Sequence, residues 1–239
     1  MNPDLVYIVR GGENEELRYS LRSVAENLPH ATVWLVGGAP KWVRNVDRLG
    51  FQEWEGPGAK WRNIVNGLAV AADSALISDR FVYMNDDQFV MWPQQRMPVY
   101  HGGWLSERIR ERANSRHVRG FGATARVLEM LGAHPLPYLN YELHVPLEMN
   151  RDGLADAIKM ARTLPKSMTT GAALHVRTLY GNLYGIDGEF LEDPKIRTSH
   201  ANLERAFLST NDRSFKAEKV GAFIRDAFPN PCKYEEETT

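Results

Sequence analysis

The stretch RFVYMNDDQFVMWP, residues 80–93, indicates both the fold class and the position of a functional site. Residues 81–84 form an apolar run with β propensity and the length of one buried strand. The run stops at Asn85, Asp86 and Asp87, and apolar residues resume at residue 89. Two adjacent carboxylates at the end of a buried strand are unfavourable, because of desolvation and mutual repulsion, unless a cation offsets them.

Two interpretations of this acidic pair are open at this point. In the first, Asp86 and Asp87 hold Mg²⁺ or Mn²⁺, because these ions prefer carboxylate and phosphate oxygens and because ligands collect at strand ends in α/β sheets. In the second, Asn85, Asp86 and Asp87 form a solvated turn between two hairpin strands, which is a common use of these residue types.

The composition is ordinary for a globular protein and excludes several functions. The 239 residues, 43% hydrophobic and 25% charged, are enough for one large core. A formal net charge of −1 gives no field that attracts nucleic acid or an anionic membrane. The single cysteine, Cys232, excludes an internal disulfide framework and a cysteine-based zinc cluster. Since no apolar run reaches membrane-spanning length and no signal peptide is recognised, we expect a cytoplasmic protein without a membrane span.

The region before residue 80 has the pattern of a parallel sheet. Apolar runs at residues 5–9 and 32–36 predict two strands, each ending at a glycine pair, with a helix between them. A strand-helix-strand order favours parallel pairing. We also expect a short third strand at residues 51–54 and a helix over residues 60–75. These elements predict an α/β fold.

Four side chains in this region are candidate ligands of an anion. Arg18 and Arg22 stand one helical turn apart and could clamp a phosphate or a carboxylate, although two surface arginines paired with glutamates of the same segment would have the same pattern. Lys60 and Asn63 lie at the first turn of the expected helix 60–75, where backbone N–H groups and the helix dipole favour an anion.

Several segments carry a family resemblance. They are ELRYSLRSV (16–24), PKW (40–42), Asn63 with YMNDDQF (83–89), YELHVP (141–146), and FLSTND (207–212) with FPNPCKYE (228–235). In order and spacing they resemble the second, third and fourth blocks of the Stealth family, the sugar-1-phosphate transferases of bacterial capsule synthesis and lysosomal-enzyme tagging. The family's first block reads like VYTWVDGSD. Residues 6–12 here read VYIVRGG without the acid, and we expect either Arg10 or the backbone amides of Gly11 and Gly12 to contact phosphate in that place.

The resemblance implies an activity and a set of site residues. It implies transfer of hexose 1-phosphate from a nucleotide-sugar donor to a hydroxyl of a glycan, lipid or protein acceptor, with Mg²⁺ or Mn²⁺ on Asp86 and Asp87. It implies that His144 is the general base, a role that suits imidazole near neutral pH, whereas a lone histidine held by one hydrogen bond is the structural alternative. The further candidates for donor or acceptor contacts are Asn85, Lys166, Asn211 and Asp212, of which Asp212 could instead cap a helix at residues 216–228.

The expected architecture is a mostly parallel α/β sheet with flanking helices, resembling the GT-A core of nucleotide-sugar transferases. We expect one catalytic domain over residues 1–234, with a nucleotide-sugar-binding half (1–100), a mainly helical half (101–234) and a disordered tail (235–239). Further helices are expected at residues 104–116, 124–131, 154–164 and 174–184. Two other functions stay open: a GT-A-type glycosyltransferase that releases nucleoside diphosphate, and a non-catalytic nucleotide-sugar-binding protein.

Overall fold

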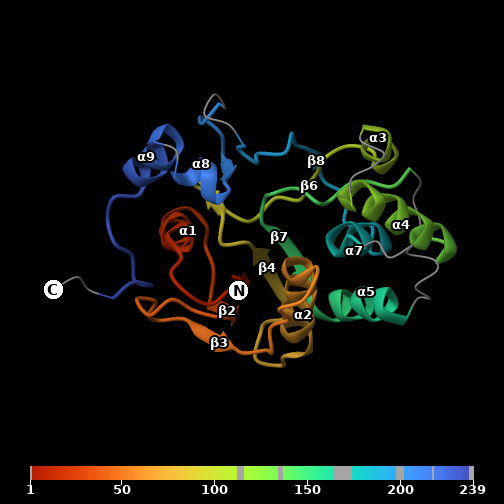
Figure 1. The fold of residues 1–239 in the computed structure, drawn as a ribbon, viewed down its shortest axis with the longest axis horizontal. Helices are drawn as coiled ribbons and strands as arrows, with labels where there is room; N and C mark the ends of the chain where they lie inside the picture. Colours follow the sequence, from red (N-terminus) through yellow and green to blue (C-terminus); the bar gives the residue numbers. More distant parts are fainter. Residues whose placement is uncertain are drawn as a thin grey trace.

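The computed structural model of the chain is built around one mixed five-stranded sheet (Figure 1). It describes residues 2–111, 116–133, 137–163, 174–197, 202–216 and 218–236. The sheet has the order β3-β2-β1-β4-β7, in which all neighbours are parallel except the antiparallel pair β4 and β7. Its strands are β1 (Asp4–Val9), β2 (Val33–Gly37), β3 (Asp47–Leu49), β4 (Arg80–Met84) and β7 (Leu147–Asn150). The predicted mostly parallel sheet is therefore confirmed.

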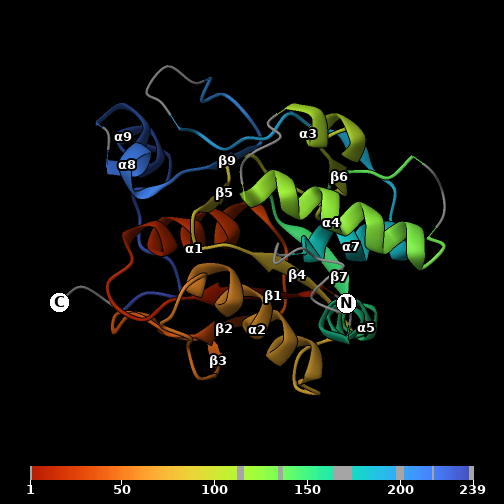
Figure 2. The same ribbon diagram turned by 45° about the vertical axis from the view of Figure 1, so that its right-hand side comes forward.

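Helices cover both faces of this sheet (Figure 2). In the buried strands successive side chains point to opposite faces, so Leu5 and Tyr7 pack with α1 (Glu15–Asn27), whereas Val6 packs with α2 (Ala59–Asp73). Helix α5 (Arg151–Thr163) lies beside α2 on the same face. Both strand faces are buried, which explains why β1, β2 and β4 read as continuous apolar runs.

The predicted strand at residues 51–54 is wrong. The third strand is β3, which pairs with β2 through residues 47–49. Phe51 packs against the core from a loop, and the backbone N–H and C=O of Trp54 bind the side chain of Asn63 instead of a neighbouring strand. The apolar character of this segment therefore comes from side-chain packing and not from sheet pairing.

The rest of the chain adds helices and two short strand pairs. These elements are β5 (Gln88–Val90) paired with β9 (Phe207–Ser209), β6 (Tyr100–His101) paired with β8 (Glu189–Phe190), α3 (Leu105–Glu111), α4 (Arg116–Met130), α7 (Val176–Leu183), α8 (Asp212–Lys216) and α9 (Glu218–Ala227). Strands β5 and β9 and helices α8 and α9 share a small core of their own. The pairing of β5 with β9 brings residue 210 beside Asp87, because the Thr210 N–H donates to the Asp87 carbonyl over 3.0 Å.

The segment at the described C-terminal end is ordered, and the prediction of a disordered tail starting at residue 235 is wrong for Glu235. Its carboxylate binds Arg22 at 2.6 and 2.8 Å and Arg18 at 2.9 Å, and it accepts the backbone N–H of Cys232. The Glu235 side chain is 1% exposed. Five acidic and hydroxyl residues at the end of a chain look solvated, but one of them is buried here because two guanidinium groups neutralise it. Residues 237–239 lie outside the described part.

None of the helices that the structure describes combines the length and the apolar character needed to cross a membrane.

Candidate active site

The chain turns sharply after β4, and the turn is held by its own side chains. The Tyr83 hydroxyl donates to Asn85 Oδ1 over 2.6 Å, and the Asn85 N–H donates to Gln88 Oε1 over 3.1 Å. The chain then continues into β5, which pairs with β9 and not with β4. The acidic residues therefore occupy a turn, as the second interpretation proposed, but the turn does not connect two strands of a hairpin. The turn lies at the carboxyl edge of the parallel strands, where ligands collect.

The two aspartates have different partners. Asp86 Oδ2 accepts a 2.6 Å hydrogen bond from Asn14 Nδ2, and Asn14 also caps α1 by accepting the Leu17 N–H. Asp87 Oδ2 instead accepts a 2.6 Å bond from Lys195 Nζ. Burial and the charge of Asp87 raise the pKa of Asp86 above its usual range. The hydrogen bond from Asn14 and the charge of Lys60 act in the opposite direction.

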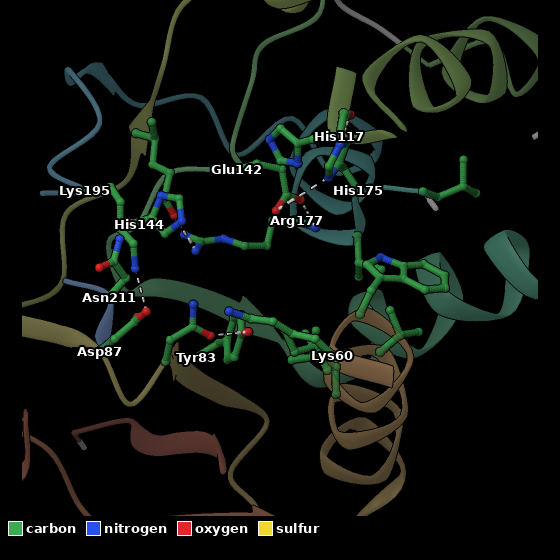
Figure 3. Close-up of a pocket in the computed structure, with 18 of the residues that line it drawn as sticks. Lys60, Tyr83, Asp87, His117, Glu142, His144, His175, Arg177, Lys195 and Asn211 are labelled. Atoms are coloured by element: carbon green, nitrogen blue, oxygen red, sulfur yellow. Dashed lines mark hydrogen bonds and ion pairs between the residues drawn. The ribbon is translucent and has the colours of Figure 1, made fainter. Parts of the chain in front are cut away.

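Asp87 lines a cavity of about 590 Å³, which is shown in Figure 3. Charged and polar residues gather at one end of it, and the view shows Asp87, Lys195 and Asn211 there. Its lining consists of Gly58, Lys60, Trp61, Ile64, Val65, Leu68, Tyr83, Asn85, Asp87, His117, Glu142, Leu143, His144, Leu174, His175, Val176, Arg177, Lys195, Asn211 and Asp212. A volume of this size suits a small-molecule substrate.

Lys195 is a site residue that sequence reasoning missed. Its side chain is only 9% exposed, and its ammonium group binds Asp87, the Ser209 hydroxyl at 3.2 Å and the Thr210 carbonyl. It lies 108 positions after Asp87 in an unremarkable Asp-Pro-Lys sequence. No local pattern marks such a residue, because only the pairing of β5 with β9 brings the two segments together.

His144 lines the cavity and is held by Asp193. Its Nδ1 lies 3.0 Å from both carboxylate oxygens of Asp193, and Asp193 Oδ1 also accepts the His144 backbone N–H. Burial alone would raise the pKa of Asp193, but the hydrogen bonds and charge of His144 bring it to about 2. When Nδ1 carries the proton donated to Asp193, the ring's Nε2 is left as a proton acceptor. This geometry is typical of a base oriented by a carboxylate, and sequence reasoning missed Asp193.

Arg177 fixes the backbone on both sides of His144. Its guanidinium donates to the Leu143 and Val145 carbonyls, both over 2.7 Å. The Arg177 side chain is buried, and burial lowers its pKa. Two bonds that bracket one residue restrict where its side chain can point, so Arg177 is a second residue that positions His144.

The opposite end of the cavity contains a pair of histidines. His117 and His175 lie in edge contact there, with ring centroids 4.5 Å apart, and Glu142 Oε2 is 4.0 Å from His175 Nδ1 (Figure 3). Burial and the nearby His175 lower the pKa of His117 to about 4, so His117 is neutral near pH 7. The adjoining wall is mainly apolar and comes from α2 and the start of α7, through Trp61, Ile64, Val65, Leu68, Leu174 and Val176.

Asn211 and Asp212 reach the cavity from the start of α8. The Asn211 side chain accepts the Ser214 N–H over 2.9 Å, so Asn211, and not Asp212, caps the following helix. Next to them, the Thr210 hydroxyl donates to Glu16 of α1. Burial raises the pKa of Glu16 to about 7, and the charges of Asp87, Asp86 and Asp212 add to the shift against the Thr210 hydrogen bond.

Several predicted site residues are not brought to the cavity. Arg18 and Arg22 bind Glu235 and do not line the cavity. Both predicted partners, a donor phosphate and a glutamate of the same segment, are therefore wrong. Asn63 binds the backbone of Trp54, and Asp86 is turned toward Asn14. Arg10 is exposed and does not line the cavity. Lys166 lies outside the described residues.

The glycine pairs after β1 and β2 serve a close approach of the backbone. The Gly38 N–H donates to the Val9 carbonyl over 2.8 Å. A Cβ atom built on Gly38 would lie 2.3 Å from the backbone of Gly11, a distance that no side chain tolerates. Gly37 and Gly38 are thus explained by packing of the strand ends against one another.

The acidic pair fits a divalent cation that a substrate also binds. The described residues contain no group of three or more His, Cys, Asp or Glu side chains that could hold a metal ion. Mg²⁺, however, is usually held by one or two carboxylates together with substrate phosphates. Asp87 offers hard carboxylate oxygens in the cavity wall, and Asp86 adds a second carboxylate next to it in the chain, which fits that mode of binding.

Comparison with known proteins supports the fold. No protein-family model matches the sequence, and no curated protein matches it. The galactosyltransferase LgtC, solved in complex with donor and acceptor sugar analogues, matches with a TM-score of 0.54 at 10% identity, over 98% of this chain and 98% of that one. An active-site mutant of LgtC matches with a TM-score of 0.53 at 10% identity, over 96% of this chain and 98% of that one.

At this identity the likeness concerns the fold alone, and it confirms the predicted GT-A-like α/β architecture. The chain also spans 46% of the glycosyltransferase GlyE of Streptococcus pneumoniae, but the TM-score of 0.41 is too low to carry an argument. The Stealth resemblance therefore rests on the sequence segments that suggested it.

Proposed function

We propose that this protein is an enzyme that transfers a group from a nucleotide-sugar donor to an acceptor hydroxyl. The observation that carries the proposal is that one cavity, at the carboxyl edge of the parallel strands, is lined by the Asp87–Lys195 pair and by His144 of the His144–Asp193 pair. The first pair provides charge for a diphosphate, and the second provides a base for a hydroxyl. The fold shared with LgtC agrees with this assignment.

The donor is assigned to the charged end of the cavity. Asp87, with Asp86 behind it, would hold Mg²⁺ or Mn²⁺, which when bound neutralises a diphosphate and its leaving group. Lys60 and Lys195 add positive charge, and Asn85 and Asn211 add polar contacts. Lys60 is the second residue of α2, where the helix N-terminus also favours an anion.

The acceptor is assigned to the side of the cavity that His144 faces. The imidazole takes the proton of the acceptor hydroxyl on Nε2, while Asp193 stabilises the ring as it becomes charged. Arg177 holds the peptide groups beside His144 in place. Asp212, the first residue of α8, lines the same cavity and would support the site.

Within this class we propose transfer of hexose 1-phosphate, as the Stealth resemblance implies. The acceptor oxygen forms a bond to the sugar-linked phosphorus, the bond from that phosphorus to the bridging oxygen breaks, the proton passes to His144, and nucleoside monophosphate leaves. The alternative is transfer of the sugar itself. In that reaction the acceptor attacks the anomeric carbon and nucleoside diphosphate leaves. The same charged groups serve both reactions, so the leaving nucleotide distinguishes them.

A donor screen tests the proposal. Purified protein is incubated with UDP-, GDP- and CDP-linked sugars, Mg²⁺ or Mn²⁺ and glycan, lipid or peptide acceptors, and the released nucleotide is followed by chromatography with and without EDTA. Metal-dependent release of UMP, GMP or CMP supports sugar-phosphate transfer, and release of a diphosphate supports the glycosyltransferase alternative.

The same screen addresses the non-catalytic alternative. Donor binding measured by calorimetry, without turnover for any acceptor, would favour a nucleotide-sugar-binding protein. Absence of both binding and turnover for every donor would overturn the proposed function.

A further inference from the structure

Lys195 is placed as an internal counter-ion of the acidic turn. An ammonium group has three N–H donors, and all three have oxygen acceptors here: Asp87 Oδ2 at 2.6 Å, the Ser209 hydroxyl at 3.2 Å and the Thr210 carbonyl. The Lys195 side chain is 9% exposed and that of Asp87 is 16% exposed. This is a desolvated ion pair that lines the cavity, and not a surface contact.

The pair occupies one of the two carboxylate oxygens that a metal could use. Asp87 Oδ2 is taken by Lys195, and Asp87 Oδ1 lies 3.5 Å from the Ser209 hydroxyl. A divalent cation on Asp87 must therefore displace the Lys195 ammonium group or bind close beside it. The repulsion between these two positive charges is strong in a partly desolvated site.

The lysine can leave Asp87 without movement of the backbone. On one side of it, the Ser209 N–H donates to the Pro194 carbonyl, and on the other the Ile196 N–H donates to the Ser209 carbonyl over 2.7 Å. These bonds fix the segment against β9. Rotation of the long lysine side chain is enough to exchange one anionic partner for another.

We propose that Lys195 blocks divalent cation binding by the donor-free protein, and that an anionic donor releases the block by offering its phosphate oxygens to the ammonium. This inference rests on the proposed function, because it takes the donor to be a nucleotide diphosphate. It makes metal and donor binding mutually dependent. By thermodynamic linkage, each then raises the affinity for the other by the same factor.

The test measures Mn²⁺ alone, without donor or acceptor, by electron paramagnetic resonance of free Mn²⁺ and by calorimetry. We expect weak binding by the wild type and at least tenfold tighter binding by Lys195→Met. Lys216→Met is the matched control, because Lys216 is an exposed lysine of α8 that does not line the cavity. We expect less than a threefold change for this variant.

Two additional variants keep the result interpretable. Lys195→Gln retains a hydrogen-bond donor for Ser209 and Thr210, and it replaces Lys195→Met if that variant unfolds in thermal melts. Asp87→Asn added to the lysine variant should remove the gained Mn²⁺ binding. Unchanged Mn²⁺ affinity in both Lys195 variants, or an equal gain in Lys216→Met, would overturn the proposal.

The outcome can be separated from that of the donor screen. The Mn²⁺ titration uses no donor and no turnover, so a silent donor screen does not alter what it says about Lys195 and Asp87. Conversely, the protein could transfer sugar phosphate while wild type and Lys195 variants bind Mn²⁺ equally. The proposed function would then stand, and the proposed block of metal binding by Lys195 would be overturned.

Discussion

Two buried carboxylates in this protein meet cations from distant parts of the chain, and they are used differently. Glu235 is bound by Arg18 and Arg22 and is 1% exposed, whereas Asp87 is bound by Lys195 and is 16% exposed in the wall of a cavity. In the Glu235 cluster, protein donors surround the carboxylate. In the Asp87 pair, one side of the charge remains open to a ligand.

The comparison shows that charge complementarity does not by itself identify a site. Arginine presents a rigid fork that matches a carboxylate, which suits a permanent clamp between α1 and the C-terminal segment. Lysine carries a point charge on a flexible stem and can exchange partners. The Arg22–Glu235 pair is thus suited to stabilising the fold, and the Lys195–Asp87 pair is suited to binding a ligand.

The largest effect is expected for Asp87→Asn. It removes the charge that opposes Lys195 and that would hold the metal, so turnover should fall about a thousandfold, as expected for several kcal/mol of lost electrostatic stabilisation. The protein should stay folded, which circular dichroism and thermal melts will show. Near-normal turnover in a folded Asp87→Asn protein would remove Asp87 from the proposed site.

Glu235→Gln should act on stability instead. The change leaves Arg22 buried without its counter-charge, and breaking a buried ion pair in this way lowers the free energy of unfolding by about 3 kcal/mol. Urea denaturation measures the change, with Glu236→Gln as the control, because Glu236 forms an exposed pair with Arg44 and should lose less than about 1 kcal/mol. The turnover of the folded fraction should be kept. Equal losses of unfolding free energy in both variants would contradict the difference between the buried Glu235 pair and the exposed Glu236 pair.

His144→Ala should lower turnover about a hundredfold if His144 is the base. Donor affinity, measured by calorimetry, should be retained, because the imidazole is assigned to the acceptor. His101→Ala serves as the control, since His101 does not line the cavity. Unchanged turnover in His144→Ala would assign the His144–Asp193 pair a structural role.

The smallest expected effect is a pH dependence. Burial would raise the pKa of Glu235, but the hydrogen bond from Arg22, the Cys232 N–H and the charges of Arg22 and Arg18 lower it below its usual value. Its stabilising contribution is thus fully present above the unfolded pKa of about 4.3 and is lost as the pH falls below that value.

The wild type and Glu235→Gln are compared by thermal melts at pH 7, 5 and 3.5 to check this dependence. The difference between their stabilities should narrow at the lowest pH. A constant difference would show that Glu235 acts through its shape and not through its charge.

The strands and helices were largely predictable, because local pattern carries them. Strands β1, β2 and β4 are buried on both faces and therefore read as continuous apolar runs. The wrong strand prediction at residues 51–54 has the same origin. The apolar Phe51 side chain packs on the core, but its backbone is not paired with a neighbouring strand. Local composition alone does not separate these two causes.

The site was predictable only in part. Asp87, His144, Asn85, Lys60, Asn211 and Asp212 were named from the sequence and do line one cavity. Arg18 and Arg22 have the spacing of an anion clamp, and they do clamp a carboxylate, but it is Glu235. Lys195 and Asp193 carry no local signal, because their roles depend on partners 108 and 49 positions away.

The parallel α/β core and the acidic pair at the end of β4 can be read from the amino-acid sequence, because burial on both strand faces and an abrupt change to charged residues are local properties of the chain. Which cation meets which carboxylate depends on the folded chain. Ion pairing depends on distance in space, and the pairing of β5 with β9 and the return of the C-terminal segment to α1 set those distances.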